Sequence, residues 1–215
     1  MIRRNATSVA ACGLAALSAG CASPPSHIYT LSQSRTAVVQ PTETSSTLEV
    51  VVGPVSIPGI VDRPQIVVQK GPNQVSLDEF NRWASPLANN ISHVVAANLT
   101  TMLGTSRISY FPTADVDYSV AIDVQTFESA PGNAATLTAT WTVHRLKDGK
   151  TQTGRTAVTE PSPEKGYEAL AAAHSRALGR LSQDIADTIR VLDHPVQSLT
   201  QDKPNDGAIA NTGPR

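Results

Sequence analysis

Three aspartates near the start of one predicted strand are the side chains that most suggest acid–base chemistry. Asp115 and Asp117 flank the start of that strand, and Asp123 lies further along it. Two carboxylates in one site can serve as general acid and general base. The alternation of the strand, however, places Asp123 on the face expected to be wet. We therefore interpret all three as solvated acids and predict no catalytic residue.

The histidines do not form the pattern that a metal site would need. None lies at ligand spacing from a cysteine, an acid or another histidine. The chain has them at His27, His93, His144, His174 and His194. His174 lies on the apolar side of a predicted helix, so we expect it to be packed or at the rim of the core. The sequence also has no nucleophile elbow or phosphate-binding loop, so we predict no metal, no cofactor and no enzymatic activity.

One cysteine lies in a context that favours covalent modification. Arg3 and Arg4 precede a short apolar run over residues 9–17, which is too short to span a bilayer. Small residues then stand directly before Cys21. This pattern is similar to the bacterial lipobox, in which the cysteine is acylated and becomes the first residue of the mature chain. We predict residues 1–20 to be a lipoprotein signal peptide and Cys21 to be the lipidated residue.

The match departs from the lipobox at one position and leaves alternatives. Leucine usually stands three residues before the modified cysteine, where this chain has Ser18, and Leu17 stands one place earlier. Cys12 also follows small residues, but the apolar stretch before it is too short for export. An ordinary secretory signal followed by a free thiol at Cys21 is the other interpretation.

Composition and charge limit which cellular compartment and which kinds of partner the protein can have. Cys12 would leave with the signal, so the mature chain has no cysteine pair for a disulfide. The formal net charge is −1 and aromatic residues make up 4% of the chain, which does not favour nucleic acid. Two or more acyl chains such as palmitate would hold the protein on a membrane. Ser23 stands where an aspartate typically retains lipoproteins in the inner membrane, so we expect the periplasmic face of the outer membrane.

Alternating and β-branched runs predict eight strands. Val75 and Leu77 alternate with polar residues, which is the pattern of a half-buried strand. Gly53-Pro54 favours a bulge or an edge position, and Asp148-Gly149 favours a hairpin turn. We predict a three-stranded antiparallel meander over residues 118–159. The eight runs cover residues 27–31, 48–57, 66–68, 75–77, 107–111, 118–127, 136–146 and 153–159.

Two helices follow from the spacing of apolar residues. The first is expected to open at Ser85, with Pro86 at its first helical position, and to end at Gly104. The second is expected to open at Ser162 and to carry a regular apolar stripe that continues to Leu192. A stripe of this length should pack lengthwise on the sheet.

Two short motifs carry a family resemblance. They are DRPQIV at residues 62–67 and RWASPL at residues 82–87. Together with the order of elements around them, they resemble the PqiC/YmbA-type family of bacterial lipoproteins over residues 27–194. The family commonly has a glutamate where this chain has Ser85. The motifs are structural rather than catalytic, so they indicate a family better than they indicate a chemistry.

The resemblance implies a function. PqiC/YmbA-type proteins are auxiliary lipoproteins of ABC-type and MCE-type intermembrane transport systems. It implies a membrane-anchored, non-enzymatic docking component that helps to move lipid between the two membranes and supports envelope integrity. The implied partners are an MCE-domain periplasmic protein and its inner-membrane transporter, and the family further suggests a homo-oligomeric ring.

The recognised segment also supplies the candidate partner-binding residues, which are Arg63, Pro64, Gln65 and Trp83. Arg63 has two interpretations: a local ion pair with Asp62 or Glu79, or a position on a partner-facing loop. Trp83 likewise has two. It is either a core residue beneath the first helix or an exposed interface hot spot.

The predicted fold is α+β, with two layers. A mixed, largely antiparallel sheet packs against two long helices. Residues 21–47 would hold the lipidated N-terminus, a short strand and a linker, and residues 48–194 the α+β domain, to which the first strand near 27–31 belongs. Residues 195–215 are expected to form a disordered tail.

A second class of function stays open at this point. The chain could be an envelope hydrolase or a lipoprotein that binds a small ligand. Either function would need a concave site lined by convergent polar groups.

Overall fold

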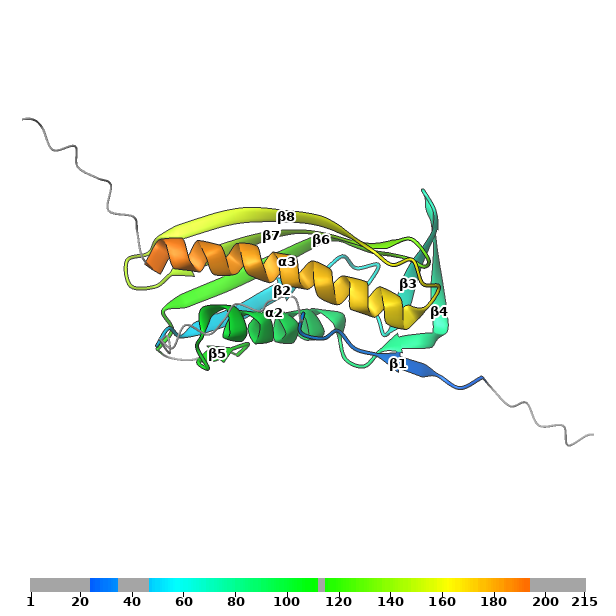
Figure 1. Cartoon of the computed structure of the whole chain (residues 1–215), viewed down its shortest axis with the longest axis horizontal. Coiled ribbons are helices and arrows are strands. Elements are labelled where there is room, and N and C mark those ends of the chain that lie inside the picture. The colour runs from blue at the N-terminus through cyan, green and yellow to red at the C-terminus, as the bar shows by residue number, and fades with distance from the viewer. Residues whose placement is uncertain (1–23, 35–46, 112–114, 194–215) are drawn as a thin grey trace, which may run out of the picture.

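The computed structural model describes residues 24–34, 47–111 and 115–193, with one long helix running along the body (Figure 1). Its elements follow the predicted order of four strands, a helix, four strands and a second helix. This confirms the predicted α+β class. The elements are β1 (His27–Tyr29), β2 (Val50–Ser56), β3 (Gln65–Gly71), β4 (Gln74–Trp83), α2 (Leu87–Leu103), β5 (Ile108–Ser109), β6 (Tyr118–Ala130), β7 (Ala134–Arg145), β8 (Thr151–Pro161) and α3 (Tyr167–Asp193).

Five strands form the larger sheet, in the order β5-β2-β6-β7-β8. β6, β7 and β8 pair antiparallel, which confirms the predicted meander, whereas β2 pairs parallel with both β5 and β6. The register of β2 shifts between Val52 and Val55, where the bulge at Gly53-Pro54 was predicted. Along each strand, alternate side chains turn toward the helices. In β7 the buried apolar residues are Ala135, Leu137, Ala139, Trp141 and Val143, and the buried Arg145 ends the strand.

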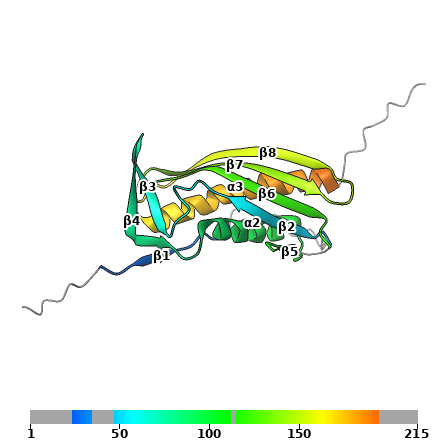
Figure 2. The ribbon, with the colours of Figure 1, turned by 180° about the vertical axis from the view of Figure 1, so that it is seen from behind.

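Both helices cover the same face of this sheet (Figure 1). From behind, the strands lie in front of the helices (Figure 2). Asn98 Nδ2 of α2 donates a hydrogen bond of 3.1 Å to Ser182 Oγ of α3, so the two helices also contact each other. The apolar stripe of α3 is buried, as its spacing predicts, through Leu170, Leu178, Leu181, Ile185 and Ile189. Neither described helix is long and apolar enough to cross a bilayer.

One glycine in β8 makes room for a large core side chain. Gly154 pairs with Trp141 across the strands, and a Cβ at Gly154 would lie 2.2 Å from Trp141 Cζ2. Trp141 Nε1 donates to Thr156 Oγ1 at 3.0 Å, and this hydroxyl donates to Asp184 Oδ2 of α3 at 2.5 Å. The indole therefore connects the sheet to the helix, and only glycine fits beneath it.

Three strands form a second, smaller sheet in the order β1-β4-β3. β3 and β4 are an antiparallel hairpin, and β1 pairs parallel with the end of β4. This sheet lies across one end of the body, next to the N-terminal end of α3 (Figure 1). The strands expected in one sheet are thus divided between two.

Three element boundaries differ from the sequence prediction. β4 continues through Trp83, where an aromatic start to the helix was expected. The N-cap position of α2 is Pro86 and makes no side-chain hydrogen bond, so the predicted cap by Ser85 does not form. α3 begins at Tyr167 rather than at Ser162, because the Ser162 N–H still donates to the carbonyl of Asn133 in the β6–β7 turn. The predicted end of α2 is correct, with Gly104 in the left-handed conformation at φ 66°.

Candidate docking surface

The β3–β4 hairpin follows from local sequence. Ile66, Val67 and Val68 are β-branched and suit an extended strand, and the turn at residues 71–73 contains glycine, proline and asparagine. Ile66 pairs with Asp78 and Val68 pairs with Ser76. Because paired side chains share a face of the sheet, Asp78 and Ser76 turn inward with the two buried side chains.

One tyrosine hydroxyl joins the small sheet to α3, and a second links two strands of the sheet itself. Tyr167 of α3 donates to Asp78 Oδ2 at 2.6 Å, and Tyr29 of β1 donates to Asn81 Oδ1 at 2.9 Å. Burial alone would raise the pKa of Asp78, but hydrogen bonds from Tyr167, Asn81 and the Phe80 N–H outweigh it and lower the pKa. Burial and the same carboxylate raise the pKa of the Tyr167 hydroxyl. The small sheet is therefore held to α3 by a charge-assisted hydrogen bond.

An aromatic cluster, the junction cluster of Trp83, Phe127 and His174, fills the space between the two sheets. The Phe127 and His174 rings stack with their centroids 3.8 Å apart, and Trp83 meets both rings edge-on. His174 Nε2 lies 2.8 Å from Ser129 Oγ, and its Nδ1 has no hydrogen-bond partner among the described residues. Burial lowers the pKa of His174 to about 3, so the ring is neutral at neutral pH. His174 is packed, as its place on the apolar stripe predicts.

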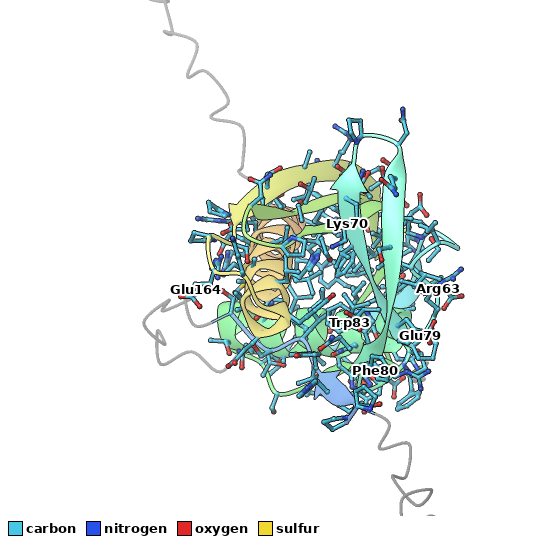
Figure 3. The ribbon with its side chains drawn as sticks, turned by 90° about the vertical axis from the view of Figure 1, so that its right-hand side faces the viewer. Arg63, Lys70, Glu79, Phe80, Trp83 and Glu164 are labelled. Carbon is cyan, nitrogen blue, oxygen red and sulfur yellow. The ribbon has the colours of Figure 1, made fainter. Side chains whose placement is uncertain are left out.

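The small sheet also exposes several large apolar side chains, although Val67, which pairs with Leu77, is buried. We call Ile28, Val75, Leu77 and Phe80 the outer apolar strip; Ile28 is 60% exposed and the other three are each 42% exposed. Figure 3 views the molecule from this end, with the β3–β4 hairpin in front of the body. The alternation of Val75 and Leu77 was correctly interpreted as a strand, but their side chains face solvent rather than the core. Exposed large apolar side chains gathered in one small sheet are candidates for an interaction surface.

The candidate residues Arg63, Pro64 and Gln65 lie at the start of β3, on the edge of the small sheet. The described residues show no ion pair from Arg63 to Asp62 or Glu79, and Arg63 Nε is buried without a hydrogen-bond partner there. Glu79 instead accepts a hydrogen bond of 3.2 Å from Gln65 and lies 4.0 Å from Arg82. Figure 3 shows Arg63 to one side of the hairpin.

Trp83 belongs to the core rather than to the surface. Its side chain is 6% exposed, and its backbone N–H donates to the Pro64 carbonyl at 2.8 Å. This bond joins the two recognised motifs in space. The structure thus brings all four candidate residues to one end of the molecule, with Trp83 inside and the other three on the rim.

The sequence matches a known family over most of its length. The profile of the ABC-type transport auxiliary lipoprotein component family matches residues 29–186. The chain belongs to this family. The match covers β2 to β8, α2 and most of α3, so it includes the β3–β4 hairpin with Val75, Leu77 and Phe80, whereas Ile28 lies just outside it. No curated protein matches the sequence.

Solved structures share this auxiliary lipoprotein fold at low sequence identity. A crystal structure of an uncharacterized protein superposes with a TM-score of 0.65 at 18% identity, covering 77% of this chain and 99% of that one. A protein from Xanthomonas campestris superposes with a TM-score of 0.61 at 22% identity, covering 80% of this chain and 100% of that one. At such identities the likeness concerns the fold.

The predicted attachment site of this family member lies outside the described residues. Cys21, the signal peptide over residues 1–20 and the tail over residues 195–215 fall there. The first described residues lead into β1 at the end that carries the outer apolar strip (Figure 1). Lipidation of Cys21 therefore remains a prediction from the sequence.

The three aspartates that were considered as candidates for acid–base chemistry have different surroundings. Asp117 Oδ2 accepts a hydrogen bond of 2.8 Å from the Glu49 N–H, and Asp123 Oδ1 accepts one of 2.5 Å from Ser56 Oγ. Asp115 is exposed. Within the described ranges, no group of three or more histidine, cysteine or acidic side chains could hold a metal ion.

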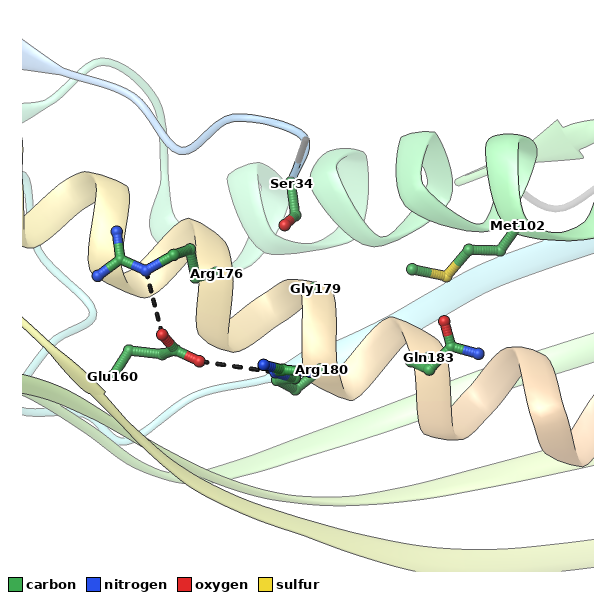
Figure 4. A pocket seen from close by; sticks show the side chains of 7 residues that line it. All are labelled: Ser34, Met102, Glu160, Arg176, Gly179, Arg180 and Gln183. Carbon is green, nitrogen blue, oxygen red and sulfur yellow. Dashed lines mark hydrogen bonds and ion pairs between the residues drawn. The ribbon is translucent and has the colours of Figure 1, made fainter. Parts of the chain in front are cut away.

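A small cavity with charged walls lies between α3 and the end of β8 (Figure 4). Glu160 lies 3.1 Å from Arg176 Nε and 3.7 Å from Arg180 Nε, so the carboxylate is shared between two guanidinium groups. The cavity measures about 80 Å³, against roughly 300–1,000 Å³ for typical ligand pockets. These residues therefore join the strand to the helix by ion pairs and leave little room for a ligand.

The functional feature that the sequence did not reveal is the outer apolar strip. Val75 and Leu77 were visible as alternating residues, but alternation does not say which face of a strand meets the core. Ile28 was assigned to a short strand and Phe80 to a helix start, so neither indicated an exposed apolar side chain. The strip exists only once β1 has paired with β4.

Proposed function

We propose that this protein is the membrane-anchored auxiliary lipoprotein of an intermembrane lipid transport system of the ABC/MCE type. It acts as a non-enzymatic docking component that supports envelope integrity. Membership of the transport auxiliary family supports the transport role, and the edge position of β3 in the small sheet, with Arg63, Pro64 and Gln65 at its start, is the observation that supports docking. The proposed partners are an MCE-domain periplasmic protein and its inner-membrane transporter, with the lipoprotein as a homo-oligomer.

Acylated Cys21 anchors the protein, and Ser23 in place of an aspartate supports the periplasmic face of the outer membrane as its location. The rim residues Arg63, Pro64 and Gln65 are the proposed partner-facing positions. Arg63 supports this assignment because it is half-buried at the edge of the small sheet and forms no ion pair within the described residues. The part of its guanidinium that reaches the surface could pair with a partner carboxylate.

Replacement of the anchor tests the first part. Cys21→Ala should give a folded protein that leaves the outer-membrane fraction and no longer supports envelope integrity. Cys12→Ala is the matched control, because that cysteine should leave with the signal peptide. If Cys21→Ala still fractionated with the outer membrane, or if the mature protein carried no acyl group by intact mass, the anchor would be wrong.

Crosslinking in intact membranes tests the second part. Pull-down of the wild-type lipoprotein should recover the MCE-domain protein, and Arg63→Ala should recover less. Arg155→Ala, which removes an exposed arginine from β8, is the matched control and should recover as much as the wild type. Equal recovery from all three proteins would exclude Arg63 from the contact.

A further inference from the structure

The chain that follows the predicted anchor enters the described structure at the end that carries the outer apolar strip. β1 begins at this end, and the β3–β4 hairpin crosses it (Figures 1 and 3). Residues 22–26 separate Cys21 from β1, and a fully extended chain of this length spans about 20 Å. If Cys21 is acylated, as proposed above, β1 cannot lie further than this from the bilayer.

The body is longer than this tether. α3 has 27 residues, which corresponds to about 40 Å of helix. Its C-terminal end lies at the opposite end of the molecule from β1 (Figure 1). Leu146, in the β7–β8 turn, lies near that distal end, because the neighbouring Arg145 guanidinium donates to the carbonyl of Leu192. With that anchor, the tether keeps β1 close to the bilayer, whereas Leu146 lies at the end of the body away from β1.

The chemistry of the outer face suits lipid. Ile28, Val75, Leu77 and Phe80 are aliphatic or aromatic and project from neighbouring strands, since β1 and β4 are paired. In water, an exposed apolar strip on a sheet favours aggregation. At a bilayer the same side chains can be buried among headgroups and the upper acyl chains. The charges of the neighbouring segment balance, because residues 62–83 contain three acidic side chains, Asp62, Asp78 and Glu79, and three basic ones, Arg63, Lys70 and Arg82.

We propose that the outer apolar strip rests in the interface of the bilayer that holds the acylated Cys21. The small sheet then sets the orientation of the protein, with α3 directed away from the membrane. Arg63 and Pro64, at the edge of the sheet, stay beside the membrane and accessible to a partner. Because the neighbouring charges balance, the contact depends on apolar burial and little on anionic lipid.

Single-cysteine labelling of the full acylated protein tests this orientation. Acylation occupies Cys21, so Leu77→Cys and, separately, Val75→Cys each provide one reactive thiol for an environment-sensitive fluorophore. Leu146→Cys is the matched control, since Leu146 is similarly exposed at the distal end. Each protein is placed in vesicles of phosphatidylethanolamine and phosphatidylglycerol, with and without lipid that carries a nitroxide quencher in its acyl chain. Intact mass confirms acylation first.

The proposal expects the labels at residues 75 and 77 to lose most of their fluorescence to the lipid quencher, and the label at residue 146 to lose little. The quenching should persist when phosphatidylcholine replaces phosphatidylglycerol. Acylated protein whose labels at residues 75 and 77 stay in water would overturn the proposal and leave the anchor intact; in that case the strip faces a protein. Quenching that requires phosphatidylglycerol would overturn its apolar basis. Absence of the acyl group would overturn the anchor, and the orientation with it.

Discussion

The two sheets of this protein use apolar residues in different ways. The five-stranded sheet buries one complete face beneath α2 and α3 and exposes mainly polar residues on the other. The three-stranded sheet has only a small inner face, held to the body by the Tyr167–Asp78 hydrogen bond and the junction cluster, and four of its large apolar side chains remain exposed. The larger sheet buries the main core, and we propose that the smaller sheet presents a contact surface.

Two leucines allow a direct test of this difference. Leu137 in β7 is fully buried and Leu77 in β4 is 42% exposed. Leu137→Ala should lower the free energy of unfolding by about 2–5 kcal/mol, because it removes packed methyl groups and leaves a cavity. Leu77→Ala should change it by less than about 1 kcal/mol. Urea denaturation of both variants measures the contrast, and equal losses would mean that the strip is part of the core.

Acid should act mainly at the junction between the sheets. His174 is buried and neutral with a lowered pKa, so the unfolded chain takes up its proton first as the pH falls. The contribution of His174 to stability is complete above its unfolded pKa and decreases below it, by up to about 1.4 kcal/mol per pH unit. This loss should continue from about pH 6.5 toward pH 3. His174→Gln should flatten this dependence in urea denaturation at a series of pH values, and an unchanged slope would contradict the assignment.

The scaffold should also be sensitive to one added methyl group. Gly154→Ala places a Cβ where the Trp141 ring lies, so the indole or the strand must move. We expect a loss of about 1–3 kcal/mol and a change in tryptophan fluorescence, measured by thermal denaturation and emission spectra. Gly59→Ala is the control, because nothing lies within 4 Å of a Cβ there. Similar effects of the two substitutions would show that Trp141 is not in close contact.

The smallest expected effect concerns the attachment of the small sheet. Tyr167→Phe removes the hydrogen bond to Asp78 and should cost about 1–2 kcal/mol near neutral pH. Because the pKa of Asp78 is lowered in the folded state, this contribution is present above its unfolded pKa and is lost as the pH falls through the folded value. Tyr29→Phe, which loses a bond to a neutral amide, should cost less. If the loss of unfolding free energy in Tyr167→Phe did not decrease in acid, the effect of Tyr167 would not arise from its hydrogen bond to Asp78.

Much of the fold could be predicted from periodicity, because helices and strands leave regular apolar patterns in the sequence. The stripe of α3, the meander of β6 to β8 and the break at Gly53-Pro54 are of this kind. The missed boundaries have local causes. Ser162 and Pro163 have the residue types of a helix start. The Ser162 N–H instead donates to the Asn133 carbonyl, which holds Ser162 against the β6–β7 turn. Phe80 and Trp83 suggested a helix start, but pairing of Trp83 with Tyr29 extends the strand.

The candidate site was predicted only in part. The recognised motifs located Arg63, Pro64, Gln65 and Trp83, and the Trp83 N–H to Pro64 bond shows that the motifs meet in space. The motifs did not indicate which of these four residues are exposed. They also did not indicate that β1, with Ile28, would pair beside them. An alternating strand can turn either of its faces toward a core. Which side chains are buried therefore depends on the elements that pack against each face.

The sequence by itself determined the element types, their order and the family, since these depend on patterns within short stretches of chain. Tertiary structure alone decided that the strands divide into two sheets, that Trp83 lies inside and that Leu77 lies outside. The reason is that burial depends on residues distant in the sequence. His27–Tyr29 selects the end of β4 as its neighbour, and only then does an apolar face remain uncovered beside the predicted anchor.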